Sequence, residues 1–393
     1  MDKPRRVQDA EVTDKTVLVR VDYNVPLKDG AVEEDSRIEA SLPTLSLLLK
    51  NGGKVVLLSH LGRPKGKIVP GLSLDAVGEE LGRILARPVE KLDDCVGAEV
   101  ELAVRKGGPG DVFLLENLRF HPEEEDNEPG FSSRLAALGD IYVNDAFATL
   151  HRAHASTLGI TEWLPAYAGV LVQKEVEILS RLVENPPHPY LAVIGGKKAK
   201  SKIGTLNELI NRVDTVLIGG GVAFTFLKAK GYPVGNSIVD ESLIDEVRGL
   251  IKAAEKQEVE ILLPKDVVIA QGLNASSETS NCRADKIPSG WMGVDIGPET
   301  IHEFSGRIGQ ARAVIWAGPM GAFEFEPFVN GTREIAAAMA RTAAFTVVGG
   351  GETGEAVSKL GFKDAMSYIS TGGGATLSFL RGKPLPALDA LLT

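Results

Sequence analysis

Short apolar segments alternate with longer amphipathic segments along the whole chain. In the first half, the short segments end in polar residues and predict β-strands over 16 to 23, 54 to 60, 111 to 117 and 140 to 146. The amphipathic segment 36 to 53 lies between the first two and ends in glycine, as helices often do. Strands that are apolar almost throughout and alternate with helices predict parallel sheets covered by helices on both faces.

The second half repeats this pattern, but its apolar segments end in clusters of glycine. The clustered segments are 191 to 196, 215 to 221, 345 to 351 and 367 to 374. Glycine lets the backbone adopt positive φ and approach a ligand, so that its N–H groups and the following helix N-terminus can point at an anion. The first half has arginines and histidines in the corresponding loops. This asymmetry predicts two lobes that bind different ligands.

A strongly amphipathic segment before the proline-rich sequence NPPHP divides the chain. The 393 residues are too many for one hydrophobic core and fit two lobes. We therefore expect an N-terminal lobe over residues 1 to 168, a connecting helix over 169 to 185, and a second lobe over 186 to 372. Both lobes are expected to be Rossmann-like α/β units, in which ligands bind at the carboxyl ends of the strands.

Composition and charge narrow the class of protein. The net charge of −10 argues against a general nucleic-acid binder, because no part of the chain concentrates enough Lys and Arg to offset it. Only Cys95 and Cys282 are present, which fits a reducing compartment and structural roles for both thiols. The start of the chain lacks a signal-peptide pattern, and no stretch approaches the roughly 18 apolar residues of a membrane span. We expect a cytoplasmic protein with no membrane or nucleic-acid partner.

Positive and amide side chains gather where the strands of the first half end. The segment SHLGRPKG directly follows a predicted strand, and its planar guanidinium can bind phosphate or carboxylate through two parallel hydrogen bonds. Taken alone, this segment has the alternative of being a solvated basic loop. Other strand ends carry similar residues, so we predict an anion pocket at this sheet edge, formed by Asp22, Asn24, Arg37, His60, Arg63, Arg119 and Arg152.

Two motifs suggest other chemistries. His151 and His154 stand three residues apart and could be metal ligands, but no cysteine or third histidine lies near them in sequence, so we expect structural roles. Gly349, Gly351 and Gly354 match GxGxxG after a predicted strand, as in dinucleotide-dependent oxidoreductases. The ribose-binding acid expected roughly 20 residues further on is missing. An oxidoreductase therefore remains only an alternative.

Charged residues beside the glycine clusters indicate binding sites for phosphate and for a metal ion. Lys198 and Lys202 stand four residues apart, so at the start of a helix they share one face. Glu352 and Thr353 follow a glycine triplet, where a carboxylate among N–H groups is best explained by a bound cation such as Mg²⁺.

Taken in chain order, these segments resemble the phosphoglycerate kinase family over essentially the whole sequence. The resemblance implies reversible phosphoryl transfer between 1,3-bisphosphoglycerate and Mg-ADP, giving 3-phosphoglycerate and ATP. It also implies a monomer and a C-terminal segment, 373 to 393, that returns to the first lobe. The matching segments are RVDYNVP, DSRI, SHLGRPKG, LLENLRF, NDAFATLHRAHAS, GGKKAKSKI, LIGGGVAFTFL, WMGVDIGP, WAGPMGAFE, VVGGGETGEA and STGGGATLSFL.

The resemblance also implies roles for individual residues. The arginine-rich pocket of the first half would hold the phosphoglycerate. Glu324 would accept hydrogen bonds from the ribose hydroxyls, and Glu352 would bind the metal. The residues that would hold the nucleotide are Lys198, Lys202, Gly220, Gly221, Gly293, Pro319, Glu324, Gly351, Glu352 and Thr353.

The chemistry of this transfer explains why such residues suffice. The nucleophile in either direction is an anionic oxygen, so no general base has to remove a proton. Catalysis then rests on in-line positioning and on neutralising charge over the transferring oxygens. We assign that role to Arg37, Lys202, the magnesium ion and the amides of Gly372, Gly373 and Gly374. We expect closure about the connecting helix to join the substrates and exclude water.

Several positions depart from the usual pattern of the family. Lys197 and Lys200 are additional cations, and Ser201 replaces an acid. Ala317 stands where an asparagine is usual, and Glu352 replaces an aspartate. Our hypothesis is that Lys197 or Lys200 compensates for the lost amide at 317. A catalytically impaired or altered-specificity member of the family is the alternative.

Overall fold

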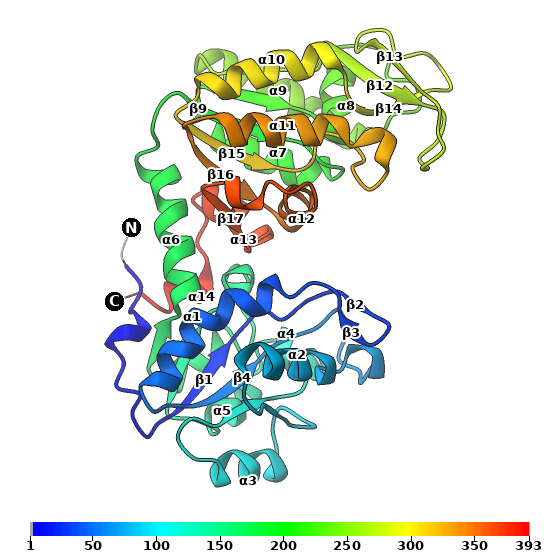
Figure 1. The fold of residues 1–393 in the computed structure, drawn as a ribbon. Helices are drawn as coiled ribbons and strands as arrows, with labels where there is room; N and C mark the ends of the chain where they lie inside the picture. Colours follow the sequence, from blue (N-terminus) through cyan, green and yellow to red (C-terminus); the bar gives the residue numbers. More distant parts are fainter. Residues whose placement is uncertain (1–2, 393) are drawn as a thin grey trace. The chain divides into compact units, whose positions relative to one another are not determined.

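The computed structural model describes residues 3 to 392 and divides into two compact units. The first unit comprises the described residues up to Glu177 and those from Pro384 onward, and the second runs from Ile178 to Lys383. Each unit is built on a six-stranded parallel sheet with helices against it (Figure 1). The predicted α/β fold with two parallel sheets is confirmed.

The first sheet has the strand order β5-β6-β4-β1-β7-β8. The chain begins at β1, builds β4, β5 and β6 on one side, and then crosses to the other side for β7 and β8. The topological switch point therefore lies between β1 and β7, where ligands bind outside the carboxyl ends of the strands. The strands are β1 (Thr16–Arg20), β4 (Lys54–Leu58), β5 (Glu90–Lys91), β6 (Val112–Leu114), β7 (Ile141–Asn144) and β8 (Ala166–Ala168).

The second sheet has a similar topology, with the strand order β11-β10-β9-β15-β16-β17. Its switch point lies between β9 and β15, because the chain adds β10 and β11 on one side before it crosses to β15. Trp316, in β15, is fully buried in the core of this unit. The strands are β9 (Tyr190–Ile194), β10 (Thr215–Ile218), β11 (Glu260–Leu262), β15 (Ala313–Ala317), β16 (Phe345–Gly349) and β17 (Tyr368–Ser370).

Helices connect most of these strands. Within residues 3 to 392, no helix is both long enough and apolar enough to cross a bilayer. The helices of the first unit are α1 (Ser36–Lys50), α2 (Asp75–Leu85), α3 (Ala98–Lys106), α4 (Pro122–Glu125), α5 (Pro129–Ala136) and α14 (Pro386–Asp389). Those of the second unit are α7 (Ala199–Leu209), α8 (Gly220–Ala229), α9 (Ile244–Lys256), α10 (Pro298–Gln310), α11 (Asn330–Arg341), α12 (Gly351–Lys359) and α13 (Gly374–Leu380).

The sequence pattern did not predict the antiparallel elements. A three-stranded antiparallel sheet of the second unit has the order β13-β12-β14, and a short hairpin, β2-β3, follows β1 in the first unit. The strands are β2 (Leu27–Lys28), β3 (Ala31–Val32), β12 (Asp266–Ala270), β13 (Thr279–Arg283) and β14 (Met292–Ile296). Most residues of β13 are polar and exposed. It therefore lacks the apolar run from which the other strands were predicted.

The C-terminal segment that belongs to the first unit begins at Pro384, later in the chain than the expected boundary at residue 373. Helix α13 belongs to the second unit, where Arg212 Nη1 donates to the Leu380 carbonyl (3.5 Å). Only residues from Pro384 onward belong to the first unit. There the Ala387 N–H donates to the Leu150 carbonyl (3.2 Å), and the Arg5 N–H donates to the Leu391 carbonyl (2.8 Å).

Helix α6 (Val170–Glu184) spans the boundary between the two units. Its first N–H groups are satisfied by side chains of the first unit. The Val170 N–H donates to Thr44 Oγ1 (2.8 Å), and the Leu171 N–H donates to Asp145 Oδ1 (2.9 Å). Asp145 is buried, and burial raises the pKa of its carboxyl to about 7. The folded protein therefore holds a proton here that the unfolded chain releases at lower pH.

This raised pKa predicts a loss of stability as pH rises from about 4 to about 7, because the unfolded state binds fewer protons across that range. Asp145→Asn mimics the protonated carboxyl. We expect its free energy of unfolding, relative to wild type, to increase by up to about 4 kcal/mol between the two ends of that range. Denaturant unfolding at several pH values measures this difference. The exposed Asp126→Asn is the control, and an identical pH trend in both variants would contradict the prediction.

Candidate active site

Arginine side chains converge on His60 at the carboxyl edge of the first sheet. Burial, together with the positive charges of Arg20, Arg119, Arg152 and Arg37, lowers the pKa of the His60 imidazole well below its ordinary value. The imidazole is therefore neutral at pH 7. Positive charges gathered at a topological switch point favour binding of an anion.

The loop after β1 and the start of α1 form one side of this arginine cluster. Arg37, in the first turn of α1, forms an ion pair with Asp22. Asp22 Oδ1 lies 3.9 Å from His60 Nδ1. Asn24 Oδ1 accepts a hydrogen bond from the Gly62 N–H (2.8 Å), which ties this loop to the loop after β4.

Arg119 and Arg152 come from the loops after β6 and β7. Arg119 lies on the 3₁₀ helix η3 (Leu118–Phe120), and its Nη1 donates to the Gly62 carbonyl (2.8 Å). Burial, and next the charge of Arg152, lowers the pKa of Arg119 to about 10, so the guanidinium is still charged at neutral pH. Arg152 is partly buried and donates to His151 Nε2 (3.3 Å). Arg63 lies on the His60 loop but is exposed.

Arg20 is a member of this cluster that the sequence analysis missed. It is almost fully buried at the end of β1, its Nε donates to Ser156 Oγ (2.8 Å), and its Nη2 lies 3.1 Å from His60 Nδ1. The buried Glu124 accepts from the same Ser156 hydroxyl (2.6 Å). Arg20 therefore contacts the His60 imidazole from the buried end of β1 and helps to position it. One sequence feature could have identified this residue: Arg20 is the only charged residue in the otherwise largely apolar segment TVLVR.

His151 and His154 were considered as metal ligands in the sequence analysis. Among residues 3 to 392, no third ligand lies close enough to both His151 and His154 to complete one. His154 Nδ1 lies 3.8 Å from Glu124 Oε1, and burial, followed by the charge of Arg20, lowers the His154 pKa to about 4.

In the second unit, backbone segments meet so closely that no side chain fits between them. A Cβ on Gly195 would lie 2.3 Å from the Pro319 carbonyl oxygen, and one on Gly318 would lie 2.1 Å from the Gly195 oxygen. A Cβ on Gly220 would lie 2.4 Å from the Gly196 nitrogen. The Gly196 N–H donates to the Pro319 carbonyl (2.7 Å). The loops after β9, β10 and β15 are thereby joined at the switch point of the sheet.

Lysines surround the start of α7. Its first turn, AKSK, contains no acid, although the N-terminal end of a helix carries partial positive charge and favours anions. Lys197, Lys198, Lys200 and Lys202 all lie in or beside this turn. Burial lowers the pKa of Lys202 to about 8, while the charge of Glu352 acts in the opposite direction. Lysines concentrated at this end of a helix repel one another unless an anion binds there.

A cavity of about 810 Å³ opens beside these lysines. Ile238 is 44% exposed and gives the cavity an apolar surface. This combination of size, apolar lining and convergent charge suits a small organic anion. The lining includes Lys197, Lys198, Lys200, Ser201, Gly221 and Ile238.

The start of α12 lies at the same edge of the second sheet. Thr353 Oγ1 accepts a hydrogen bond from the Gly318 N–H (2.7 Å), so this hydroxyl holds the loop after β15 in place. Gly351 and Glu352, in the first turn of the helix, are exposed. An exposed carboxylate at a helix N-terminus, near Lys202, is available to a divalent cation.

The remaining predicted residues come from several other elements of the second unit. Gly293, on β14, packs against Phe224, where a Cβ would lie 2.1 Å from the ring. Glu324 is exposed in the loop after β15. The Gly372 N–H donates to Ser370 Oγ (3.2 Å), so the protein itself already uses this amide. Gly373 is the N-cap of α13 and is partly buried, whereas Gly374, the first residue of the helix, is exposed.

Comparison with known proteins identifies the family. The family model described as phosphoglycerate kinase matches residues 7–383. The phosphoglycerate kinase of Moorella thermoacetica is 51% identical over 385 residues, which cover 98% of both chains. The solved structure of phosphoglycerate kinase from Coxiella burnetii has a TM-score of 0.86 and 39% identity, over 99% of this chain and 98% of that one. The Pyrococcus horikoshii OT3 enzyme has a TM-score of 0.85 and 32% identity, over 98% of each chain. This chain therefore belongs to the phosphoglycerate kinase family.

Proposed function

We propose that this protein transfers a phosphoryl group reversibly between 1,3-bisphosphoglycerate and Mg-ADP, giving 3-phosphoglycerate and ATP. Family membership over residues 7–383 supports this reaction. The observation that carries the proposal is the pair of unlike anion sites, one formed by arginines in the first unit and one by glycines and lysines in the second. A donor and an acceptor that both carry phosphate need two such sites.

Phosphoglycerate is proposed to bind to the first unit. Arg37 is paired with Asp22, which orients its guanidinium, and Arg119 is held by the Gly62 carbonyl. Side chains fixed in this way lose little further freedom when they bind an anion. The neutral His60 donates or accepts a hydrogen bond without adding charge. The proposed ligands are Asp22, Asn24, Arg37, His60, Arg63, Arg119 and Arg152.

The nucleotide is proposed to bind to the second unit. The base would lie against Ile238 in the cavity, and its phosphates would extend toward the start of α7 and α12. Lys202 would contact the transferring group, because a largely buried ammonium group interacts strongly with a phosphate once water is excluded. Glu324 would bind the ribose. The other proposed ligands are Lys198, Gly220, Gly221, Gly293, Pro319, Gly351, Glu352 and Thr353.

Magnesium is the proposed metal, and Glu352 is its proposed protein ligand. Mg²⁺ in kinases is held by one or two carboxylates together with substrate phosphates, and the exposed Glu352 carboxylate at the start of α12 fits that donor set. The bound ion would neutralise charge on the nucleotide phosphates.

The reaction requires positioning and charge neutralisation. The attacking oxygen is anionic in both directions, so Arg37, Lys202 and the amides of Gly373 and Gly374 need only stabilise the charge of the transferring group. The substrates must meet for transfer, and we propose that closure about α6 brings them together. We also propose that the protein is a cytoplasmic monomer, which its acidic composition and two unpaired cysteines support.

The reaction is tested in a coupled assay with 3-phosphoglycerate and Mg-ATP. We expect turnover by the wild-type protein and a decrease in kcat of at least about 100-fold for Lys202→Ala, because one charge that stabilises the transition state is removed. Lys230→Ala removes an exposed lysine of the same unit and should leave kcat unchanged. Absence of turnover in the wild-type protein would refute the proposed reaction.

The added lysines are tested separately. Ala317 is fully buried and brings no polar group to the nucleotide, whereas Lys197 and Lys200 are exposed and line the cavity. A charge-assisted contact contributes about 1.5 to 3 kcal/mol, so we expect Lys197→Ala or Lys200→Ala to weaken ADP binding by roughly tenfold or more. Titration calorimetry measures this, with Lys256→Ala on α9 as control. Unchanged affinity in both variants would exclude compensation for the missing amide.

A further inference from the structure

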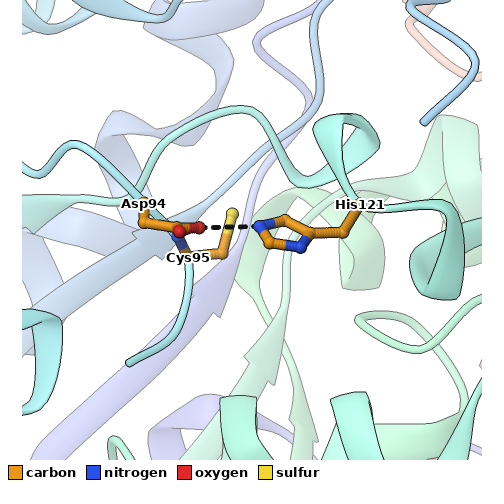
Figure 2. Close-up of side chains that lie close together, drawn as sticks. All are labelled: Asp94, Cys95 and His121. Atoms are coloured by element: carbon orange, nitrogen blue, oxygen red, sulfur yellow. Dashed lines mark hydrogen bonds and ion pairs between the residues drawn. The ribbon is translucent and has the colours of Figure 1, made fainter. Parts of the chain in front are cut away.

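A second group of potential ligands in the first unit contains none of the proposed substrate ligands. Asp94 and Cys95 lie in the loop after β5, and His121 directly follows η3. One donor atom from each residue lies within 4.8 Å of the other two. Figure 2 shows the imidazole pointing at the Asp94 carboxylate and the Cys95 sulfur beside it. Neither the proposed reaction nor the predicted sites use these residues.

The group has a buried sulfur and two partly exposed partners. Cys95 is fully buried, and its Sγ donates to the Glu116 carbonyl (2.9 Å). His121 Nε2 lies 2.6 Å from Asp94 Oδ1, and these side chains are 25% and 51% exposed. A cation can therefore approach from the side of Asp94 and His121 and meet the sulfur behind them.

The orientation of the imidazole is fixed by packing. The His121 ring lies 5.0 Å from the Phe131 ring, centroid to centroid, at an interplanar angle of 31°. Asp94 Oδ1 also accepts a hydrogen bond from the Cys95 N–H (2.6 Å). The imidazole is thus oriented before any ion binds, which lowers the entropic cost of binding.

The donor types select one class of metal. Sulfur, imidazole nitrogen and carboxylate oxygen are the three donors that zinc uses, whereas Mg²⁺ and Ca²⁺ prefer oxygen ligands alone. Zinc binds these atoms at about 2.0 to 2.3 Å, so two ligands of a tetrahedral site lie roughly 3.3 to 3.7 Å apart. The His121 and Asp94 atoms would separate from 2.6 Å, and the Cys95 sulfur, which lies within 4.8 Å of both, would move into that range. Rotation of the exposed Asp94 side chain can supply much of that movement.

We propose that Asp94, Cys95 and His121 bind a divalent cation of the zinc class, with water as the fourth ligand. Binding breaks the S–H bond of Cys95, forms a metal–sulfur bond and releases that proton to solvent, with no change of oxidation state. The proton on His121 Nε2, now directed at Asp94, moves to Nδ1 through solvent, which leaves the Nε2 lone pair for the metal. The hydrogen bond between Asp94 and His121 is replaced by a metal bond to each side chain. The ion would link the loop after β5 to the end of η3, the segment that carries Arg119.

The experiment uses the full-length protein after treatment with a chelator. Titration with Co²⁺ should show one equivalent bound, with the near-ultraviolet charge-transfer absorption of cobalt–thiolate bonds. Zn²⁺ should displace the cobalt, and excess Mg²⁺ should not. Absence of the thiolate absorption in the wild-type protein would overturn the proposal.

Variants assign the ligands. Cys95→Ser should abolish the thiolate absorption, and His121→Ala and Asp94→Ala should each weaken Co²⁺ binding by more than about tenfold. Cys282→Ser removes the other thiol of the chain and should leave binding unchanged. If Cys95→Ser does not fold, His121→Ala decides the question, because this side chain is partly exposed. Wild-type affinity in His121→Ala, or thiolate absorption that persists in Cys95→Ser, would refute the site.

Discussion

The second unit depends on backbone segments that approach without side chains between them. At Gly195, Gly220 and Gly318, any Cβ would lie within 2.4 Å of another backbone atom. The loops after three strands can meet at the switch point only because these positions are glycine. Their meeting brings the N-termini of α7 and α8 to one edge of the sheet, beside the lysines and the cavity. The glycine clusters of the sequence are therefore a packing requirement, in addition to the phosphate binding that we propose for them.

The first unit forms its candidate anion site from side chains, whereas the second unit uses backbone segments. Arg20, Arg37 and Arg119 are partly or fully buried and are held by Ser156, Asp22 and the Gly62 carbonyl, respectively. Burial opposes charge, and the lowered pKa values of Arg119 and Lys202 show that each unit holds a charge in a desolvated position. A bound anion offsets that desolvation. This is the physical basis for our proposal that both sites bind phosphate-bearing ligands.

The sequence predicted those parts of the molecule that depend on local pattern. Apolar runs located most of the parallel strands but not the short β5 and β8. The order of the motifs indicated the family that the comparisons confirm. The polar strand β13 has no such run, so the antiparallel sheet was missed. Arg20 was missed because its role depends on His60 and Ser156, which lie 40 and 136 positions away in the chain.

The Asp94, Cys95 and His121 group escaped prediction for the same reason. Asp94 and His121 are 27 positions apart, and nothing in the local pattern of either segment indicates that they meet. The boundary at the C-terminus also depended on tertiary packing, since α13 remains with the second unit and only the residues after it join the first. Local patterns thus identify elements and motifs, whereas contacts between distant segments require the fold.

The central claim is that the two units bind the two substrates separately. Amide hydrogen exchange, measured with 3-phosphoglycerate alone and with Mg-ADP alone, tests it most directly. We predict that 3-phosphoglycerate protects segments 59 to 66, 118 to 121 and 145 to 154. Mg-ADP should instead protect 195 to 202, 219 to 221 and 350 to 353. Protection of the same segments by both ligands, or protection by 3-phosphoglycerate in the second unit only, would contradict the claim.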